Sequence, residues 1–221
     1  MNCIFCGKNS AASKSVQHVI PESLGNTEHT LPPGVVCDTC NNYFAREVEK
    51  PLLDTPYLRH ARYQARIPSK KGRPPSVLGV HLQSLVPVAL FPSMKGDGTS
   101  IAAAREQDEQ RWIHSIRSSS HGSVVVPVPD EPDDHLLSRF LGKVAIEALA
   151  LRLLDIPGGL QAVAEMEDLS ALREYVRKGT GVRFWPFHKR KLYPPDFRFP
   201  GPDGEPFEVL HEWTFLYTKV P

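Results

Sequence analysis

Four cysteines between residues 3 and 40 have the spacing of a metal site. They form two C-x-x-C pairs, Cys3 with Cys6 and Cys37 with Cys40, and the sequence contains no other cysteine. Each C-x-x-C turn points both thiolates to one side, so two turns can surround a structural Zn²⁺ tetrahedrally. A redox dithiol or two disulfides are the alternatives, but we expect no βαβ context and no signal peptide leading to an oxidising compartment. The spacing therefore predicts a zinc site.

A helix is predicted to begin at the second cysteine pair. Its buried positions are Tyr43, Phe44 and Val48, its water-facing positions are Glu47 and Glu49, and its end is at Pro51. The interval between Cys6 and Cys37 is longer than a simple zinc ribbon needs, so we expect it to hold a hairpin. Together these features predict a treble-clef-like unit.

His18 and Asn41 are the candidates for chemistry in this unit. His18 is expected near the end of a short strand, before a turn at Gly25 and Asn26, and Asn41 in the first turn of the helix. An imidazole can deprotonate water, and an amide oxygen can bind a hard divalent cation that holds a phosphate. The alternatives are a partly buried histidine without a catalytic role and an asparagine that only caps the helix.

The order of these motifs resembles the zinc-bearing HNH nucleases of the ββα-metal group. The resemblance covers about the first fifty residues and rests on CIFC, QHVIPESLGN and VVCDTCNNYF. It implies hydrolysis of DNA phosphodiester bonds with Mg²⁺ or Mn²⁺, with His18 as the base and Asn41 as a ligand of that cation. It also implies that Cys3, Cys6, Cys37 and Cys40 hold a structural Zn²⁺. His29 is the candidate for the orienting residue of the motif, with Asn26 behind it.

Gln17 departs from this family pattern, because typical members carry an acidic residue directly before the catalytic histidine. An amide oxygen can coordinate a cation but brings no charge to it. Gln17 therefore remains a candidate ligand of the catalytic cation beside Asn41. Weak activity, a preference for a softer metal such as manganese or nickel, and loss of activity are the alternatives. Glu22 and Glu28 are close enough in sequence to replace the missing carboxylate.

The predicted fold class is α+β. Residues 1–55 would form the zinc-bound HNH nuclease module, residues 56–75 a basic helix and linker, and residues 76–221 a mixed α+β domain for recognition of a substrate or partner. Two main helices are expected in that domain, from Asp134 to Pro157 and from Leu160 to Lys178. A strand or a hairpin, interrupted at Pro87, is expected over residues 77–91. Further strands are expected over residues 122–129, at a sheet edge, and over residues 207–220. Lys143 and Glu147 are interpreted as a surface pair.

For one group of basic residues free of intervening acids, two interpretations are open: contact with a DNA backbone, and a solvated surface without a ligand. The residues of this group are Arg59, Arg62, Arg66, Lys70, Lys71 and Arg73. A second basic stretch, residues 177–191, includes Phe184 and Trp185, which favour a hydrophobic anchor slightly over base stacking.

Composition and charge bound the function further. The formal net charge of +1 argues against a histone-like binder. The sequence has no run of eighteen apolar residues, so we expect no membrane partner and a cytoplasmic location. DNA is the predicted partner, and the oligomeric state is open. Two other functions stay open, namely a zinc module that binds nucleic acid without cutting it and an adaptor for protein interactions.

Overall fold

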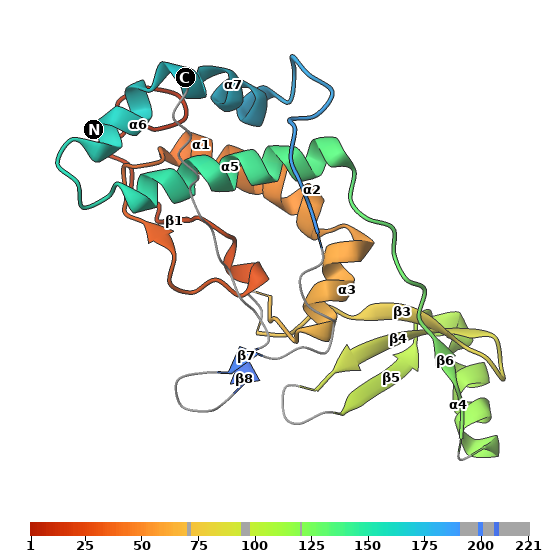
Figure 1. The fold of residues 1–221 in the computed structure, drawn as a ribbon. Helices are drawn as coiled ribbons and strands as arrows, with labels where there is room; N and C mark the ends of the chain where they lie inside the picture. Colours follow the sequence, from red (N-terminus) through yellow and green to blue (C-terminus); the bar gives the residue numbers. More distant parts are fainter. Residues whose placement is uncertain (70–71, 94–97, 120, 191–198, 201–205, 208–221) are drawn as a thin grey trace. The chain divides into compact units, whose positions relative to one another are not determined.

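The fold is α+β, as predicted, and is shown by a computed structural model (Figure 1). The structure describes residues 1–69, 72–93, 98–119, 121–190, 199–200 and 206–207. The chain divides into two compact units. Unit 1 comprises residues 1–21, 26–49 and 134–221, and unit 2 comprises residues 22–25 and 50–133. This grouping differs from the predicted ranges 1–55, 56–75 and 76–221, which stay a prediction.

Unit 1 begins with the predicted hairpin and helix. Strand β1 (Gln17–His18) pairs antiparallel with β2 (Thr30–Leu31), with His18 opposite Thr30. Helix α1 (Asp38–Phe44) is capped by Cys37, whose sulfur accepts a hydrogen bond from the Cys40 amide. The cap is therefore a cysteine of the predicted zinc site, and the alternative role of Asn41 as the cap is wrong.

Pro51 does not end this helical segment, contrary to the prediction. A π-helical turn (Ala45–Glu49) follows α1 and leads directly into α2 (Lys50–Leu53). Proline has no N–H to donate, and its ring crowds the carbonyl group four residues earlier. The wider π turn lies where that crowding would occur, which explains how the helical path continues past Pro51.

Three helices from the second half of the chain complete unit 1. They are α5 (Asp134–Arg152), α6 (Gly159–Glu165) and α7 (Ser170–Lys178), which ends at Gly179 with a φ of 67°. The two predicted helical regions are confirmed. However, α5 ends well before Pro157, and the second region is broken into α6, a 3-10 turn (Glu167–Leu169) and α7.

Helix α5 packs against β2, the π turn and α7, and it runs alongside β1 in Figure 1. Arg139 of α5 donates to Tyr43 Oη at 3.0 Å and to the Val176 carbonyl oxygen at 3.0 Å. Phe44, Ile146 and Val176 are buried. Residues from α1, α5 and α7 therefore contribute to the core of one unit.

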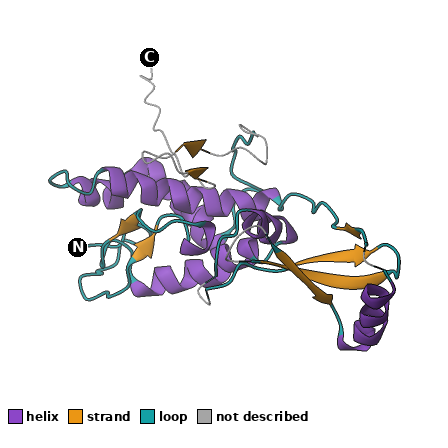
Figure 2. Cartoon of the chain, turned by 90° about the horizontal axis from the view of Figure 1, so that it is seen from below, coloured by secondary structure: helices purple, strands orange, loops and turns teal. Residues whose placement is uncertain are grey.

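Unit 2 contains a four-stranded antiparallel sheet, seen as orange strands in Figure 2. Its strands are β3 (Val77–His81), β4 (Val86–Pro92), β5 (Thr99–Ala103) and β6 (Val124–Val125), in the order β5-β4-β3-β6. The edge position of β6 is confirmed, whereas β5 was not predicted. Helices α3 (Pro56–Gln64) and α4 (Glu109–Ser118) and a 3-10 turn (Glu106–Asp108) also belong to this unit, and α4 packs against β5.

Pro87 lies inside β4 and does not interrupt it. The residue pairs with Val80 of β3, and its carbonyl oxygen accepts a hydrogen bond from the Ala104 amide at 2.9 Å. The next residue, Val88, pairs with Ala103, the last residue of β5. A proline is tolerated at this position because it lies near the start of β4, outside the residues that pair with β5, so its missing N–H removes no bond of that ladder.

The predicted strand over residues 207–220 lies almost entirely outside the described residues. Within them, β7 (Phe199–Pro200) pairs antiparallel with β8 (Pro206–Phe207). None of the helices in the described part of the chain has the length and apolarity to cross a membrane.

Candidate functional site

The four cysteines converge in unit 1 and form what we call the sulfur cluster (Cys3, Cys6, Cys37 and Cys40). All four sulfur atoms lie within 4.8 Å of one another, and the Cys6 and Cys37 sulfurs are 3.7 Å apart. The first turn is closed by a hydrogen bond from the Gly7 amide to the Cys3 carbonyl oxygen at 2.9 Å. Gly7 has a φ of 68°, which a residue without a Cβ adopts at little cost. The predicted arrangement for binding a metal ion is confirmed.

Hydrogen bonds within the sulfur cluster favour a thiolate at Cys3. The Cys37 amide donates to the Cys3 sulfur at 3.3 Å. The side-chain hydrogen bond with Cys40 lowers the pKa of Cys3 to about 4, against the opposing effect of burial, and raises the pKa of Cys40 as burial also does. A bound metal ion would replace the proton that these sulfurs share, and a set of four sulfurs suits tetrahedral Zn²⁺.

His18 lies on β1, half-buried, with Nδ1 buried and without a hydrogen-bond partner among the described residues. The next residue, Val19, donates its amide to the His29 carbonyl oxygen at 3.0 Å, so the backbone of His29 lies across from Val19. The hairpin therefore brings the two predicted histidines onto neighbouring strand ends. Their catalytic roles remain predictions.

Asn26 holds the loop that joins these strand ends. Its side-chain nitrogen donates to the carbonyl oxygens of Ile20, at 2.7 Å, and His29, at 3.0 Å. Its side-chain oxygen accepts from the amides of Glu28, at 3.2 Å, and His29, at 2.9 Å. A fully used, buried amide of this kind fixes the backbone of His29.

Asn41 is half-buried on α1, and its backbone N–H donates to the Cys37 carbonyl oxygen at 2.9 Å. The following residue, Asn42, is exposed. Asp38, in the first turn of α1, accepts hydrogen bonds from the amides of Lys14, at 3.1 Å, and Ser15, at 2.9 Å. Hydrogen bonds from Ser15 hold the pKa of Asp38 below its ordinary value. The helix start that carries Asn41 is thus tied to the segment that leads into β1.

Gln17 is buried, and its side chain is directed at α5. Its nitrogen donates to the His18 carbonyl oxygen at 3.1 Å and to Glu147 Oε2 at 3.4 Å. Within the described residues, Gln17 Oε1 has no hydrogen-bond partner. A role of this oxygen in binding the catalytic cation stays a prediction. Glu22 and Glu28, the nearest acids in sequence, are both exposed.

Behind Gln17 lies a buried group of charges, which we call the ion cluster (Glu49, Lys143 and Glu147). Lys143 Nζ is 2.7 Å from Glu49 Oε1 and 2.8 Å from Glu147 Oε2, and the side-chain exposures are 0% for Lys143, 0% for Glu147 and 15% for Glu49. Two interpretations from the sequence are therefore wrong. Lys143 and Glu147 are not a surface pair, and Glu49 does not face water, because α5 covers this side of the π turn.

Burial and charge compete within the ion cluster. Burial raises the pKa of Glu147 to about 8, although Lys143 acts in the opposite direction. Burial lowers the pKa of Lys143, but Glu147 and Glu49 outweigh it, so the net shift is upward. Both upward pKa shifts fit one ammonium group between two carboxyl groups: Lys143 stays charged, and Glu147 tends to carry a proton.

The predicted DNA-binding residues do not form one uniform surface. Arg62 is buried, and burial lowers its pKa. Arg59 and Arg73 are exposed, whereas Arg66 is half-buried with a φ of 51°. Lys70 and Lys71 lie outside the described residues.

In the second basic stretch, the Trp185 ring packs 5.7 Å from that of Tyr175. Tyr175 is buried, with an exposed fraction of 1%. This contact is consistent with the predicted hydrophobic anchor.

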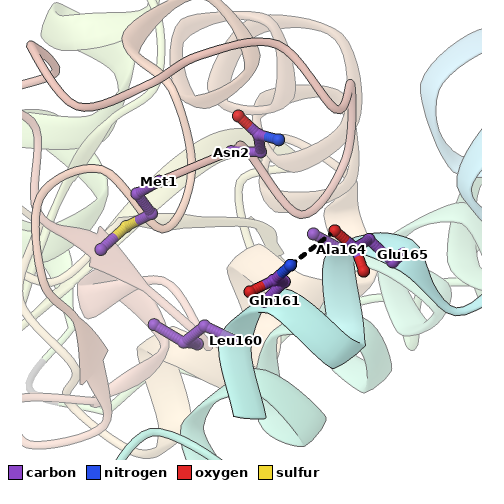
Figure 3. Close-up of a pocket in the computed structure, with 6 residues that line it drawn as sticks. All are labelled: Met1, Asn2, Leu160, Gln161, Ala164 and Glu165. Atoms are coloured by element: carbon purple, nitrogen blue, oxygen red, sulfur yellow. Dashed lines mark hydrogen bonds between the residues drawn. The ribbon is translucent and has the colours of Figure 1, made fainter. Parts of the chain in front are cut away.

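A cavity beside the N-terminus is the one drawn in Figure 3. It is lined by Met1, Asn2, Leu160, Gln161, Ala164 and Glu165. Gln161 Nε2 donates to Glu165 Oε1 at 2.9 Å along α6. None of the predicted site residues lines this cavity, so it is separate from the sulfur cluster and from the predicted catalytic residues.

Comparison with known proteins identifies the N-terminal segment. Residues 3–56 match the family of HNH endonucleases. The match contains the sulfur cluster, His18, His29 and Asn41, so the resemblance of this segment to zinc-bearing HNH nucleases is confirmed. No curated protein and no solved structure matches the chain.

Proposed function

We propose that the protein is an HNH-type endonuclease that hydrolyses DNA phosphodiester bonds with a divalent cation in the cytoplasm. The observation that carries the proposal is the sulfur cluster, which joins residues 3–6 to residues 37–40 within the segment that matches HNH endonucleases. Because Cys40 directly precedes Asn41, a metal ion held there would fix Asn41 relative to the hairpin of His18.

The chemistry divides among a few residues. His18 takes the proton from the attacking water, and His29 orients the reacting groups. Asn41, with Gln17 as a second candidate, would hold Mg²⁺ or Mn²⁺, and that cation would supply positive charge to the phosphate and the leaving oxygen. A Zn²⁺ held by the sulfur cluster would be structural, because four cysteines leave no open coordination position. Arg59 and Arg73 are candidates for contacts with the DNA backbone.

A plasmid assay tests the proposal. The parent protein is expected to nick supercoiled DNA only when Mg²⁺ or Mn²⁺ is added. His18→Ala should lower the rate by about 10²- to 10⁴-fold, the usual contribution of a general base. His188→Ala is the matched control, because His188 is an exposed histidine outside the matched segment. Zinc should remain at one ion per chain in both variants, and equal cutting by His18→Ala and the parent would refute the assignment of the base.

A zinc module that binds DNA without cutting it is the second candidate. The observation that favours it is Gln17, which supplies no charge to a cation and has its amide directed at Glu147. This candidate predicts salt-dependent DNA binding, no nicking with either cation, and the same affinity in His18→Ala. Measuring binding and nicking on one preparation separates the two functions.

A further inference from the structure

We propose that Lys143 is a positioning residue for His18: its ammonium group, held by Glu49 and Glu147, fixes the backbone of β1 from outside the segment that matches HNH endonucleases. The proposal rests on the nuclease function for its catalytic meaning, but its geometry can be tested without activity. Lys143 lies on α5, far beyond residue 56.

The contacts of Lys143 carry the proposal. Besides the two carboxylates, Nζ donates to the His18 carbonyl oxygen at 3.3 Å and to the Val19 carbonyl oxygen at 3.4 Å. An ammonium group has three protons for these four acceptors, so the carboxylates take the short contacts and the carbonyl groups share the remainder. The side chain thus binds the strand at the residue that bears the predicted base and at the next one.

The burial of the ion cluster makes this contact rigid. Lys143 has no solvent-exposed side-chain surface, so water cannot replace the carbonyl groups as acceptors. A lysine in such a place needs a counter-ion and further acceptors: Glu49 of the π turn supplies the negative charge, and Glu147 of α5 supplies a second carboxyl oxygen. One ammonium group therefore connects β1, the helical segment after Asn41 and α5.

The connection extends to Gln17. Glu147 Oε2, which contacts Lys143, also accepts the hydrogen bond from the Gln17 amide. A carboxylate at position 17, as in typical family members, would place a third acid beside Glu49 and Glu147 for one ammonium group. A neutral amide at this position is compatible with the charge of the ion cluster. This compatibility explains, independently of catalysis, why position 17 carries a glutamine and not an acid.

The test uses the double variant Lys143→Met/Glu147→Met. Replacing a buried ion pair with apolar side chains of similar volume is often neutral or stabilising, but Glu49 loses its ammonium partner here, so we expect the zinc content to be retained and the melting temperature to fall moderately. The contacts to the His18 and Val19 carbonyl groups are lost. We expect the Val19 amide proton to exchange about tenfold faster or more, and kcat for nicking to fall about 10- to 100-fold with KM for DNA unchanged.

The matched control is Lys178→Met/Glu174→Met, which removes an exposed pair of the same spacing on α7. It should leave exchange and nicking as in the parent. Parent-like exchange of Val19 and parent-like kcat in the Lys143→Met/Glu147→Met variant would overturn the proposal. If the parent itself does not nick DNA, the nuclease function fails, and the exchange of Val19 alone decides the positioning role.

A measurement on the parent protein covers the case in which the double variant does not fold. The buried ammonium group of Lys143 should give a slowly exchanging ¹⁵N signal at pH 7, with contacts to the protons of Val19. Rapid exchange of this signal with water, as for an exposed lysine such as Lys178, would overturn the proposal.

Discussion

The sulfur cluster and the ion cluster both hold the segment that carries His18, but they draw on different parts of the chain. The sulfur cluster joins residues 3–6 to residues 37–40, which flank the hairpin in sequence. The ion cluster joins the same strand to α5, and the Gln17–Glu147 hydrogen bond spans 130 positions. One cluster closes a local loop, and the other attaches that loop to a helix from the far half of unit 1.

The two clusters also differ in what they contribute. A structural metal site adds folding free energy directly, whereas a buried ion pair adds little net stability and mainly specifies an arrangement. We therefore expect the sulfur cluster to decide whether the HNH segment folds and the ion cluster to decide how accurately β1 is held. Each prediction below removes or isolates one of these contributions.

Breaking the sulfur cluster should have the largest effect. Cys40→Ser is expected to reduce the zinc content to zero and to abolish cooperative unfolding of unit 1, because structural zinc contributes about 10 kcal/mol or more to folding in small domains. Atomic absorption and thermal unfolding followed by circular dichroism measure both quantities. A variant without zinc that melts like the parent would show that the cysteines do not hold a structural ion.

Substitution on α1 comes next and tests what the sulfur cluster positions. Asn41→Ala should lower the nicking rate about 10²-fold at a fixed Mn²⁺ concentration, because a ligand of the cation is lost. Asn42→Ala is the neighbouring control, since Asn42 is exposed. The zinc content should not change in either variant. Equal rates for Asn41→Ala and Asn42→Ala would remove Asn41 from the cation site.

The ion cluster predicts a smaller, pH-dependent effect. The pKa of Glu147 is raised from 4.5 to about 8 in the folded protein, so the stability that its protonated form contributes is present below pH 4.5 and is lost as the pH rises through about 8. Between these values the parent should lose up to about 1.4 kcal/mol of its free energy of unfolding per pH unit.

Glu147→Gln should remove most of that slope. Urea unfolding at pH 6 and pH 7.5 measures the difference between parent and variant, and effects common to both, such as titration of the cysteines, cancel. Parallel pH dependences for the two proteins would contradict a buried, protonated Glu147.

The smallest effects should come from the basic residues of unit 2, which belong to neither cluster. Arg59→Ala should weaken DNA binding uniformly across sequences and reduce the salt slope of log K by about 1, as expected for one phosphate contact. Arg62→Ala, at a buried position, should change stability with little change in that slope. An unchanged slope in Arg59→Ala would exclude this residue from the DNA interface.

The sequence predicted the sulfur cluster and its surroundings well because those residues are close together in the chain. The C-x-x-C spacings, the turn at Gly25 and the helix start at Cys37 are local features, and local features leave local patterns. The division into units was not predicted, since it depends on which distant helices pack against the hairpin.

The ion cluster was misread for the same reason, although one signal pointed to it. Lys143 and Glu147 lie on the same helical face as Phe140 and Ala150, which are both buried. A charged pair at spacing i, i+4 within an apolar stripe indicates burial with a counter-ion. Its partners, Glu49 and the strand carbonyl groups, come from a different part of the chain, and no periodicity in α5 could have identified them.

The central claim, that a cation binds between His18 and Asn41 in the zinc-loaded protein, is tested most directly by titration with Mn²⁺ in an NMR experiment. Paramagnetic broadening should appear first at the His18 ring protons and the Asn41 side-chain amide, and His188 should be unaffected. Broadening that begins elsewhere, or that is equal in His18 and His188, would contradict the claim.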